Sequence, residues 1–236
     1  MSRTQSANMA ESALKKLADP ERAKQLARYF KTGSGQYGEG DRFYGIRVPD
    51  IRKTARQFQE LQLEEIESLL QSPMHETRLL SLLMLLDRYR VGGESIKKQI
   101  FLFYKTHTKR INNWDLVDIS APGIIGVHIF EKDRSLLFTL AKSSNVWERR
   151  IAVIATMYFI SKNDLEDTFT ICEKLLTDTH DLMHKACGWA LREAGKKDIK
   201  RLESFLETHI KRMPRTMLRY AIEKFPEKKR KAYLKR

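Results

Sequence analysis

The stretch that decides the fold is Trp114-Asp115-Leu116-Val117-Asp118, taken together with Trp147-Glu148-Arg149-Arg150. A shift of 36 residues along the chain moves Trp114 onto Arg150, and further steps of 36 reach Ala186 in one direction and Arg78 in the other. Self-similarity at this spacing is typical of stacked two-helix repeats. The sequence therefore predicts an all-α protein, an α-solenoid of HEAT-like two-helix repeats.

The repeat register assigns two faces to these helices. At about 100° per residue, the columns two and five positions after the repeated position point away from it, and they hold only apolar or small residues. We expect these columns to form the packed face: Leu80, Leu116, Ala152, Gly188, Leu83, Ile119, Ala155 and Leu191. The other face then collects Arg78, Trp114, Arg150, Trp189 and Asp118.

Length and composition fit one folded domain. The 236 residues are enough for one sizeable core, and 42% hydrophobic with 31% charged residues exclude a disordered chain. We expect a single domain over 1–236, with residues 1–10 and 226–236 as frayed tails.

The charge and cysteine content indicate the partners and the compartment. A net charge of +14 is typical of proteins that bind polyanions, most commonly nucleic acid, although a lysine-rich surface alone would give the same balance. Cys172 and Cys187 have no metal or redox spacing, which fits a reducing cytosol. Because no signal peptide or membrane-spanning apolar run is visible, we expect a soluble, cytoplasmic protein that does not contact a membrane.

Helix-start and turn residues divide the rest of the chain. A first helix is expected over about 11–31, interrupted at Asp19-Pro20, and another from Pro49 to about Phe58. The glycine-rich segment 33–40 lacks the Gly-Lys-Ser/Thr ending of a phosphate-binding loop and is interpreted as a connector. No strand is predicted. The remaining helices are expected in pairs at 63–71 with 75–89, 94–106 with 112–128, 132–142 with 146–160, 164–177 with 181–195, and 199–210 with 214–224.

Metal and acyl-transfer chemistry find no support in the sequence. His180 and His184 have a zinc-compatible spacing, but Asp181 occupies the place of the zincin glutamate and no third ligand is evident. No Ser/His/Asp or Cys/His arrangement can be assembled. We therefore predict no metal and no cofactor.

Trp114 and Asp118 are four residues apart, so one helical turn places them on the same side. The other repeats have Leu82, Ile154 and Ala190 in the column of Asp118, and such a departure marks either function or a structural ion pair, here with Arg150. Arginine can bind a phosphate, tryptophan can pack against a sugar or base, and a carboxylate can stabilise an oxocarbenium-like transition state. These residues indicate hydrolysis of an N-glycosidic bond in DNA, or DNA binding without chemistry.

Four segments of the chain resemble the AlkD family of bacterial HEAT-like alkylpurine DNA glycosylases, and the resemblance extends over nearly the whole sequence. The segments are Tyr44-Gly45-Ile46-Arg47-Val48-Pro49, Trp114-Asp115-Leu116-Val117-Asp118, Asn145-Val146-Trp147-Glu148-Arg149-Arg150 and Gly188-Trp189-Ala190-Leu191-Arg192-Glu193. The resemblance implies a concave basic cleft. It also implies that Asp118 is the catalytic carboxylate and that the DNA-contacting residues are Trp114, Trp189, Arg150, Tyr29, Arg47, Arg149 and Arg78.

The resemblance further implies the reaction. The expected substrates are cationic N3- and N7-alkylated purines, such as 3-methyladenine and 7-methylguanine, in duplex DNA. The base is excised by a monofunctional DNA glycosylase in base excision repair, without being flipped into a pocket. We expect a monomer, associated with the bacterial nucleoid while it acts. The alternatives are a non-catalytic HEAT-like DNA-binding protein for bent, branched or damaged DNA, and a protein-binding helical scaffold.

Overall fold

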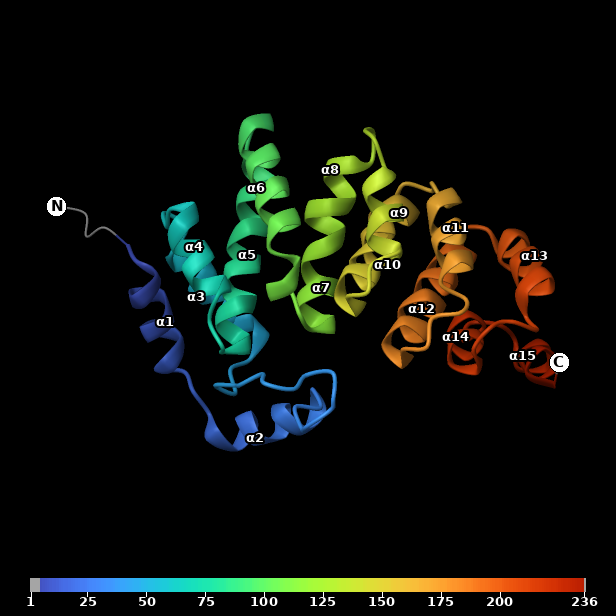
Figure 1. The fold of residues 1–236 in the computed structure, drawn as a ribbon, viewed down its shortest axis with the longest axis horizontal. Helices are drawn as coiled ribbons and strands as arrows, with labels where there is room; N and C mark the ends of the chain where they lie inside the picture. Colours follow the sequence, from blue (N-terminus) through green and yellow to red (C-terminus); the bar gives the residue numbers. More distant parts are fainter. Residues whose placement is uncertain (1–4, 236) are drawn as a thin grey trace. The chain divides into compact units, whose positions relative to one another are not determined.

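The computed structural model describes residues 5–235, and within this range the secondary structure is helical (Figure 1). The all-α prediction is confirmed. The same residues contain no strand, only an isolated bridge between Arg42 and Met74. No helix in this part of the chain has the length and apolar character needed to cross a membrane. Contacts divide the chain into two compact units, Met1–Ser120 and Ala121–Arg236.

The first unit is built around α5, a helix whose first three turns are almost wholly buried. Helices α1, α3, α4 and α6 all pack against it. Its burial explains the apolar run from Leu79 to Leu85, which shows little amphipathic alternation. The helices of this unit are α1 (Ala7–Lys15), α2 (Pro20–Tyr29), α3 (Val48–Gln57), α4 (Leu63–Leu70), α5 (His75–Val91), α6 (Glu94–Thr106), the short 3₁₀ helix η1 (Thr108–Arg110) and α7 (Trp114–Ala121), whose last residue belongs to the second unit.

The predicted helix starts are confirmed, with one correction near the N-terminus. Asp19 accepts a hydrogen bond from the backbone N–H of Arg22 at 3.0 Å, and Pro20 is the first residue of α2. Helix α1 begins at Ala7 because Ser6 caps it, so the expectation of a frayed segment up to residue 10 is wrong for residues 7–10. Residues 1–4 lie outside the described residues.

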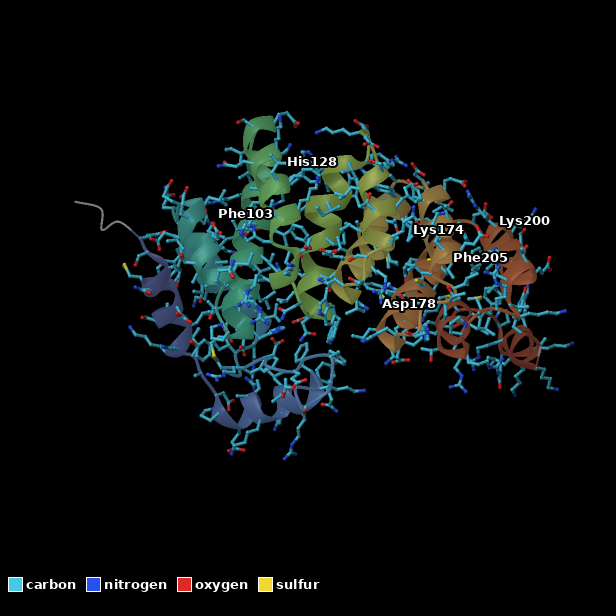
Figure 2. The ribbon with its side chains drawn as sticks, viewed as in Figure 1. Phe103, His128, Lys174, Asp178, Lys200 and Phe205 are labelled. Atoms are coloured by element: carbon cyan, nitrogen blue, oxygen red, sulfur yellow. The ribbon has the colours of Figure 1, made fainter. Side chains whose placement is uncertain are left out.

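The second unit repeats one arrangement of helical pairs. Helix α10 packs on α9 and α12 packs on α11, as two of the predicted pairs require (Figure 1). The third pair differs from the prediction, because α13 and α14 both pack mainly on α12. Phe205 on α13, labelled in Figure 2, lies 5.5 Å from the ring of Phe169 on α11. The elements are the π-helical η2 (Pro122–Gly126), α8 (Val127–Ile129), α9 (Ser135–Ala141), α10 (Val146–Ser161), α11 (Glu166–Lys174), α12 (Asp181–Lys197), α13 (Ile199–His209), α14 (Arg215–Ala221) and α15 (Glu227–Lys235).

The structure corrects two of the predictions made from the sequence. The helix expected over 112–128 is α7, followed directly by a π-helical turn at Pro122 and by α8. The tail from residue 226 was expected to be frayed, and this is wrong, since it forms α15 and buries Tyr233 against Phe225 at 5.6 Å. The packed columns of the repeat are confirmed as buried, except that Ile119 is half-buried.

Gly188 marks the closest approach of α12 to α14. A Cβ atom at this position would lie 2.6 Å from the carbonyl oxygen of Met217 and 2.5 Å from Cβ of Tyr220. We therefore predict that Gly188→Ala lowers the free energy of unfolding by about 1–3 kcal/mol, although alanine is the better helix former. Denaturant unfolding followed by circular dichroism measures this change.

Gly93→Ala is the matched control, because no atom lies within 4 Å of a Cβ placed there. Its effect should be less than half that of Gly188→Ala. Equal effects of the two substitutions would contradict the close approach of α12 to α14.

Candidate active site

The first turn of α7 positions the two residues that the sequence singled out. The side-chain oxygen of Asn113 accepts a hydrogen bond from the backbone N–H of Trp114 at 2.8 Å and so caps the helix. Trp114 and Asp118 are both half-buried and both line one cavity of about 340 Å³. The predicted placement of Trp114 and Asp118 on one side of a helix is confirmed.

Aromatic rings form one wall of this cavity. Phe30 stacks on Trp114 with ring centroids 5.3 Å apart, and Tyr29 meets Trp114 edge-on at 5.9 Å. Tyr29 is 64% exposed, so its ring stands at the rim. The cavity is lined by Leu26, Tyr29, Phe30, Phe43, Ile46, Val48, Ile51, His75, Glu76, Leu79, Trp114, Asp115, Asp118 and Ile119. A carboxylate beside an apolar, aromatic surface suits a ligand that combines a flat or hydrophobic face with positive charge.

A buried carboxylate fixes the loop that carries Phe43 into the wall. Glu76 accepts hydrogen bonds from the backbone N–H groups of Tyr44 at 3.0 Å, Gly45 at 2.8 Å and Ile46 at 3.2 Å. Gly45 has φ +85°, and a Cβ there would lie 2.1 Å from the carbonyl oxygen of Asp19. Only glycine therefore fits at this turn.

A cluster of buried charges lies behind the aromatic wall. His75 Nδ1 is 3.2 Å from Asp41 Oδ2, and His75 Nε2 is 2.8 Å from Asp115 Oδ2. Arg78 Nη2 donates to Asp41 Oδ1 at 2.6 Å. Burial opposes the charge on His75, but Asp115 and Asp41 outweigh it and raise the pKa of His75 to about 9. Burial would raise the pKa of Asp41, yet hydrogen bonds from His75 and Asn113 and the charge of Arg78 hold it below its usual value.

The predicted site residues fall in both units. Trp114, Asp118 and Tyr29 come together at the cavity in the first unit. Arg47 is exposed at the N-cap of α3, next to the cavity-lining Ile46 and Val48. Trp189, Arg149 and Arg150 belong to the second unit, where Trp189 is half-buried on α12.

Arg78 was expected on a DNA-facing surface, and this is wrong. Its side chain is 2% exposed, and it donates to Asp41 and to the carbonyl oxygen of Ser72. The segment around Asp41 covers the start of α5, because the backbone N–H of His75 donates to the carbonyl oxygen of Arg42 at 2.8 Å. Arg78 therefore compensates a buried carboxylate.

Arg149 and Arg150 also bind protein groups within the second unit. Arg149 Nε donates to Asp178 at 2.6 Å, in the loop between α11 and α12 (Asp178 is labelled in Figure 2). The guanidinium of Arg149 also donates to the carbonyl oxygens of residues 143 and 144. Its expected DNA contact stays a prediction. Arg150 is 5% exposed and donates to the carbonyl oxygen of Leu182 at 2.8 Å, two helical turns before Trp189.

The sequence reasoning did not identify Phe30, Phe43, His75, Asp41 and Asp115 as part of the site. Asp115 directly follows Trp114, and this was the one available signal. Phe43 and Asp41 lie outside helices, where the repeat register assigns no face.

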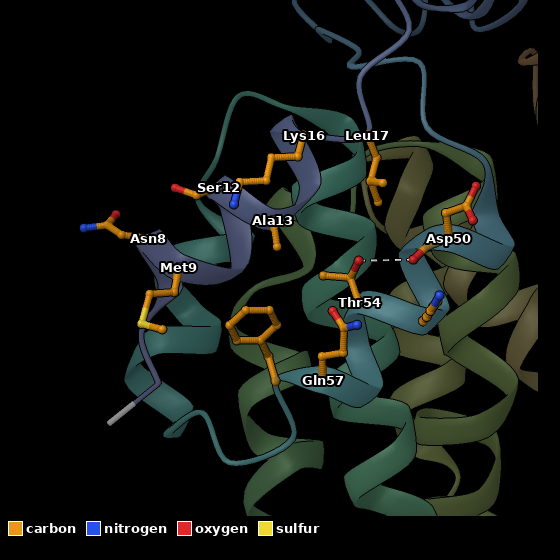
Figure 3. Close-up of a pocket in the computed structure, with 11 residues that line it drawn as sticks. Asn8, Met9, Ser12, Ala13, Lys16, Leu17, Asp50, Thr54 and Gln57 are labelled. Carbon is orange, nitrogen blue, oxygen red and sulfur yellow. Dashed lines mark hydrogen bonds between the residues drawn. The ribbon is translucent and has the colours of Figure 1, made fainter. Parts of the chain in front are cut away.

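A second, larger cavity of about 610 Å³ lies between α1 and α3 (Figure 3). Its lining includes the exposed apolar side chains of Met9 and Leu17 and one ring, that of Phe58. Thr54 there donates to the backbone carbonyl oxygen of Asp50 at 3.1 Å, the bond drawn in Figure 3. Its lining offers neither an aromatic wall nor a carboxylate pair, so the cavity at Asp118 is the better candidate for chemistry.

Two arginine substitutions separate a structural role from a surface role. Arg78→Met removes one of the two positive charges that face the buried Asp41 carboxylate, so we expect it to lower the free energy of unfolding by about 3–5 kcal/mol. Arg90 pairs with Asp87 on the same helix but is 76% exposed, and Arg90→Met should cost less than about 1 kcal/mol. Denaturant unfolding of both variants measures the difference, and similar values would contradict the structural role of Arg78.

Comparisons with known proteins identify the family of the chain. The sequence profile of the family described as "DNA alkylation repair enzyme" matches residues 10–225. A solved structure described as a predicted DNA alkylation repair enzyme from Enterococcus faecalis superposes with a TM-score of 0.69 at 18% identity, covering 89% of this chain and 97% of that one. No curated protein shows a significant match. Because the profile covers most of the residues, the chain belongs to the family of DNA alkylation repair enzymes.

Proposed function

We propose that the protein is a DNA glycosylase that hydrolyses the N-glycosidic bond of cationic N3- and N7-alkylated purines in duplex DNA. Membership of the DNA alkylation repair family gives the substrate class its support. The observation that carries the proposal is the position of Asp118, a half-buried carboxylate that shares an aromatic cavity with Trp114 and Tyr29.

The proposed reaction requires few protein groups besides such a carboxylate. An alkylated purine that already carries a positive charge leaves as a neutral base, so no general acid is required. The deoxyribose becomes oxocarbenium-like, and Asp118 stabilises this charge and orients the attacking water. The cavity lining contains no lysine that could form a Schiff base, which supports hydrolysis without strand cleavage.

Aromatic side chains supply the contact to the sugar in this proposal. Trp114 and Tyr29 pack against the deoxyribose at the lesion while the base stays stacked in the duplex. Arg47, exposed beside the cavity, binds a phosphate, and the net charge of +14 favours DNA binding. On the second unit, Trp189 contacts the DNA backbone. Arg150, which is 5% exposed and donates to the carbonyl oxygen of Leu182, holds the first turn of α12 in place.

Asp118→Asn tests the catalytic group. The substitution keeps the size of the side chain but removes its charge, so we expect release of 7-methylguanine from methylated duplex to fall about 100-fold or more. DNA affinity should stay the same or rise. Asp87→Asn, at a half-buried carboxylate of α5 that does not line the cavity, is the control and should keep the full rate.

The outcomes of this assay are distinct. A rate for Asp118→Asn within twofold of the parent protein would exclude Asp118 as the catalytic group. Tight DNA binding by the parent protein without any base release would select the non-catalytic DNA-binding alternative.

Salt dependence tests the phosphate contacts. Affinity for duplex DNA should fall steeply as salt rises, and Arg47→Ala should reduce the slope of log K against log salt by about 1. Arg90→Ala, at an exposed arginine that does not line the cavity, should leave the slope unchanged. Fluorescence anisotropy measures both, and salt-insensitive or absent DNA binding would favour the protein-scaffold alternative.

A further inference from the structure

Both ring nitrogens of His75 face carboxylate oxygens. Nδ1 is 3.2 Å from Asp41 Oδ2 and Nε2 is 2.8 Å from Asp115 Oδ2, with the side chain of His75 only 2% exposed. An ionised carboxylate can only accept hydrogen bonds, so both nitrogens have to donate. A neutral imidazole has one N–H and would leave one of the two contacts without a proton. The geometry therefore requires an imidazolium.

The charges of Asp41 and Asp115 are matched by those of Arg78 and His75 when the ring is protonated. Asp41 and Asp115 carry two negative charges, and Arg78 and the imidazolium supply two positive ones. Two further carboxylates, Glu76 and Asp118, line the same cavity; Glu76 is satisfied by three backbone N–H groups. Arg110 on η1 donates to the carbonyl oxygens of residues 70–72, and its charge interacts with that of Arg78. Loss of the proton would leave a buried carboxylate without its counterion.

The same cluster fixes the first turn of α7 at two places. Asp41 Oδ2 accepts from Asn113 Nδ2 at 2.8 Å, and Asn113 caps the helix through the backbone N–H of Trp114. His75 binds Asp115, the residue after Trp114. Trp114 is thus held between two anchored neighbours. Phe30 also stacks on Trp114, and its ring lies 4.9 Å from that of His75.

We propose that His75 is a positioning residue: as an imidazolium bridging Asp41 and Asp115, it holds α7 in the orientation that turns Trp114 and Asp118 into the cavity. The kinetic part of this inference rests on the proposed glycosylase function. The protonation of His75 and its coupling to Trp114 do not depend on that function.

The pH dependence follows from the raised pKa of His75. A group whose pKa is higher in the folded than in the unfolded protein stabilises the fold fully below the unfolded value, here 6.5, and loses this contribution as the pH rises through about 9. The orientation of α7 should therefore be kept at neutral pH and lost on the alkaline side.

Nuclear magnetic resonance of the full chain with ¹⁵N-labelled histidine and tryptophan tests the proposal without any substrate. His75, assigned by its absence in His75→Gln, should show two protonated ring nitrogens at neutral pH and titrate near 9. The indole N–H resonance of Trp114, assigned with Trp114→Phe, should shift in the same step. A neutral His75 at neutral pH, or a Trp114 resonance that ignores the titration, would overturn the proposal whether or not the protein releases bases.

Asp115→Asn adds the kinetic test. Removing this charge lowers the pKa of His75, so the alkaline fall in base release should move to lower pH by about one unit or more. We expect kcat to decrease with KM nearly unchanged. Glu67→Gln is the matched control, because Glu67 pairs with His107 at 2.9 Å away from the cavity and should leave the pH profile in place. If the rate of base release by Asp115→Asn fell by the same factor at every pH, the cluster would have a purely structural role. If that variant does not fold, the titration of the parent protein decides.

Discussion

The structure of the first unit depends on the Asp41 carboxylate. This group is 4% exposed, and both of its oxygens accept hydrogen bonds. Arg78 binds one oxygen, and His75 and Asn113 bind the other. Moving a carboxylate out of water costs several kcal/mol, and only good geometry with several donors offsets that cost. These donors come from α5 and from the residue before α7, so one buried group aligns a loop and two helices.

Apolar packing and this charged cluster have different roles. The buried columns of the repeat, such as Leu80 and Leu116, drive the helices together, but hydrophobic burial is non-directional and tolerates small rotations of a helix. The hydrogen bonds to Asn113 and Asp115 do not tolerate such rotations, because the strength of a hydrogen bond falls steeply when its distance or angle departs from the optimum. The rotation of α7, and with it the direction of Asp118, is therefore set by polar contacts that the core alone would not specify.

The difference between apolar packing and directional polar contacts explains how much of the structure could be predicted from the sequence. Helical pairs, caps such as Asp19 and the packed columns follow from periodicity and local chemistry, and the structure contains them. Trp114 and Asp118 were found because they depart from the repeat. Arg78 occupies the same column as Trp114 and yet is buried, because the segment that carries Asp41 covers the start of α5. The position of that segment depends on Glu76 and on the backbone of Gly45, and neither leaves a periodic signal.

The repeat column that contains Asp118 shows why a polar residue at an otherwise apolar position indicates a function. Leu82, Ile154 and Ala190 in the same column are each 0% exposed, so the repeat itself favours an apolar side chain there. The charge of Asp118 also acts on its surroundings: burial raises the pKa of Tyr104 above its usual value, and Asp118 raises it further. Under the proposed function, the position of Asp118 beside Trp114, on a helix anchored through Asn113 and Asp115, serves a reaction that needs a fixed negative charge next to a developing cation.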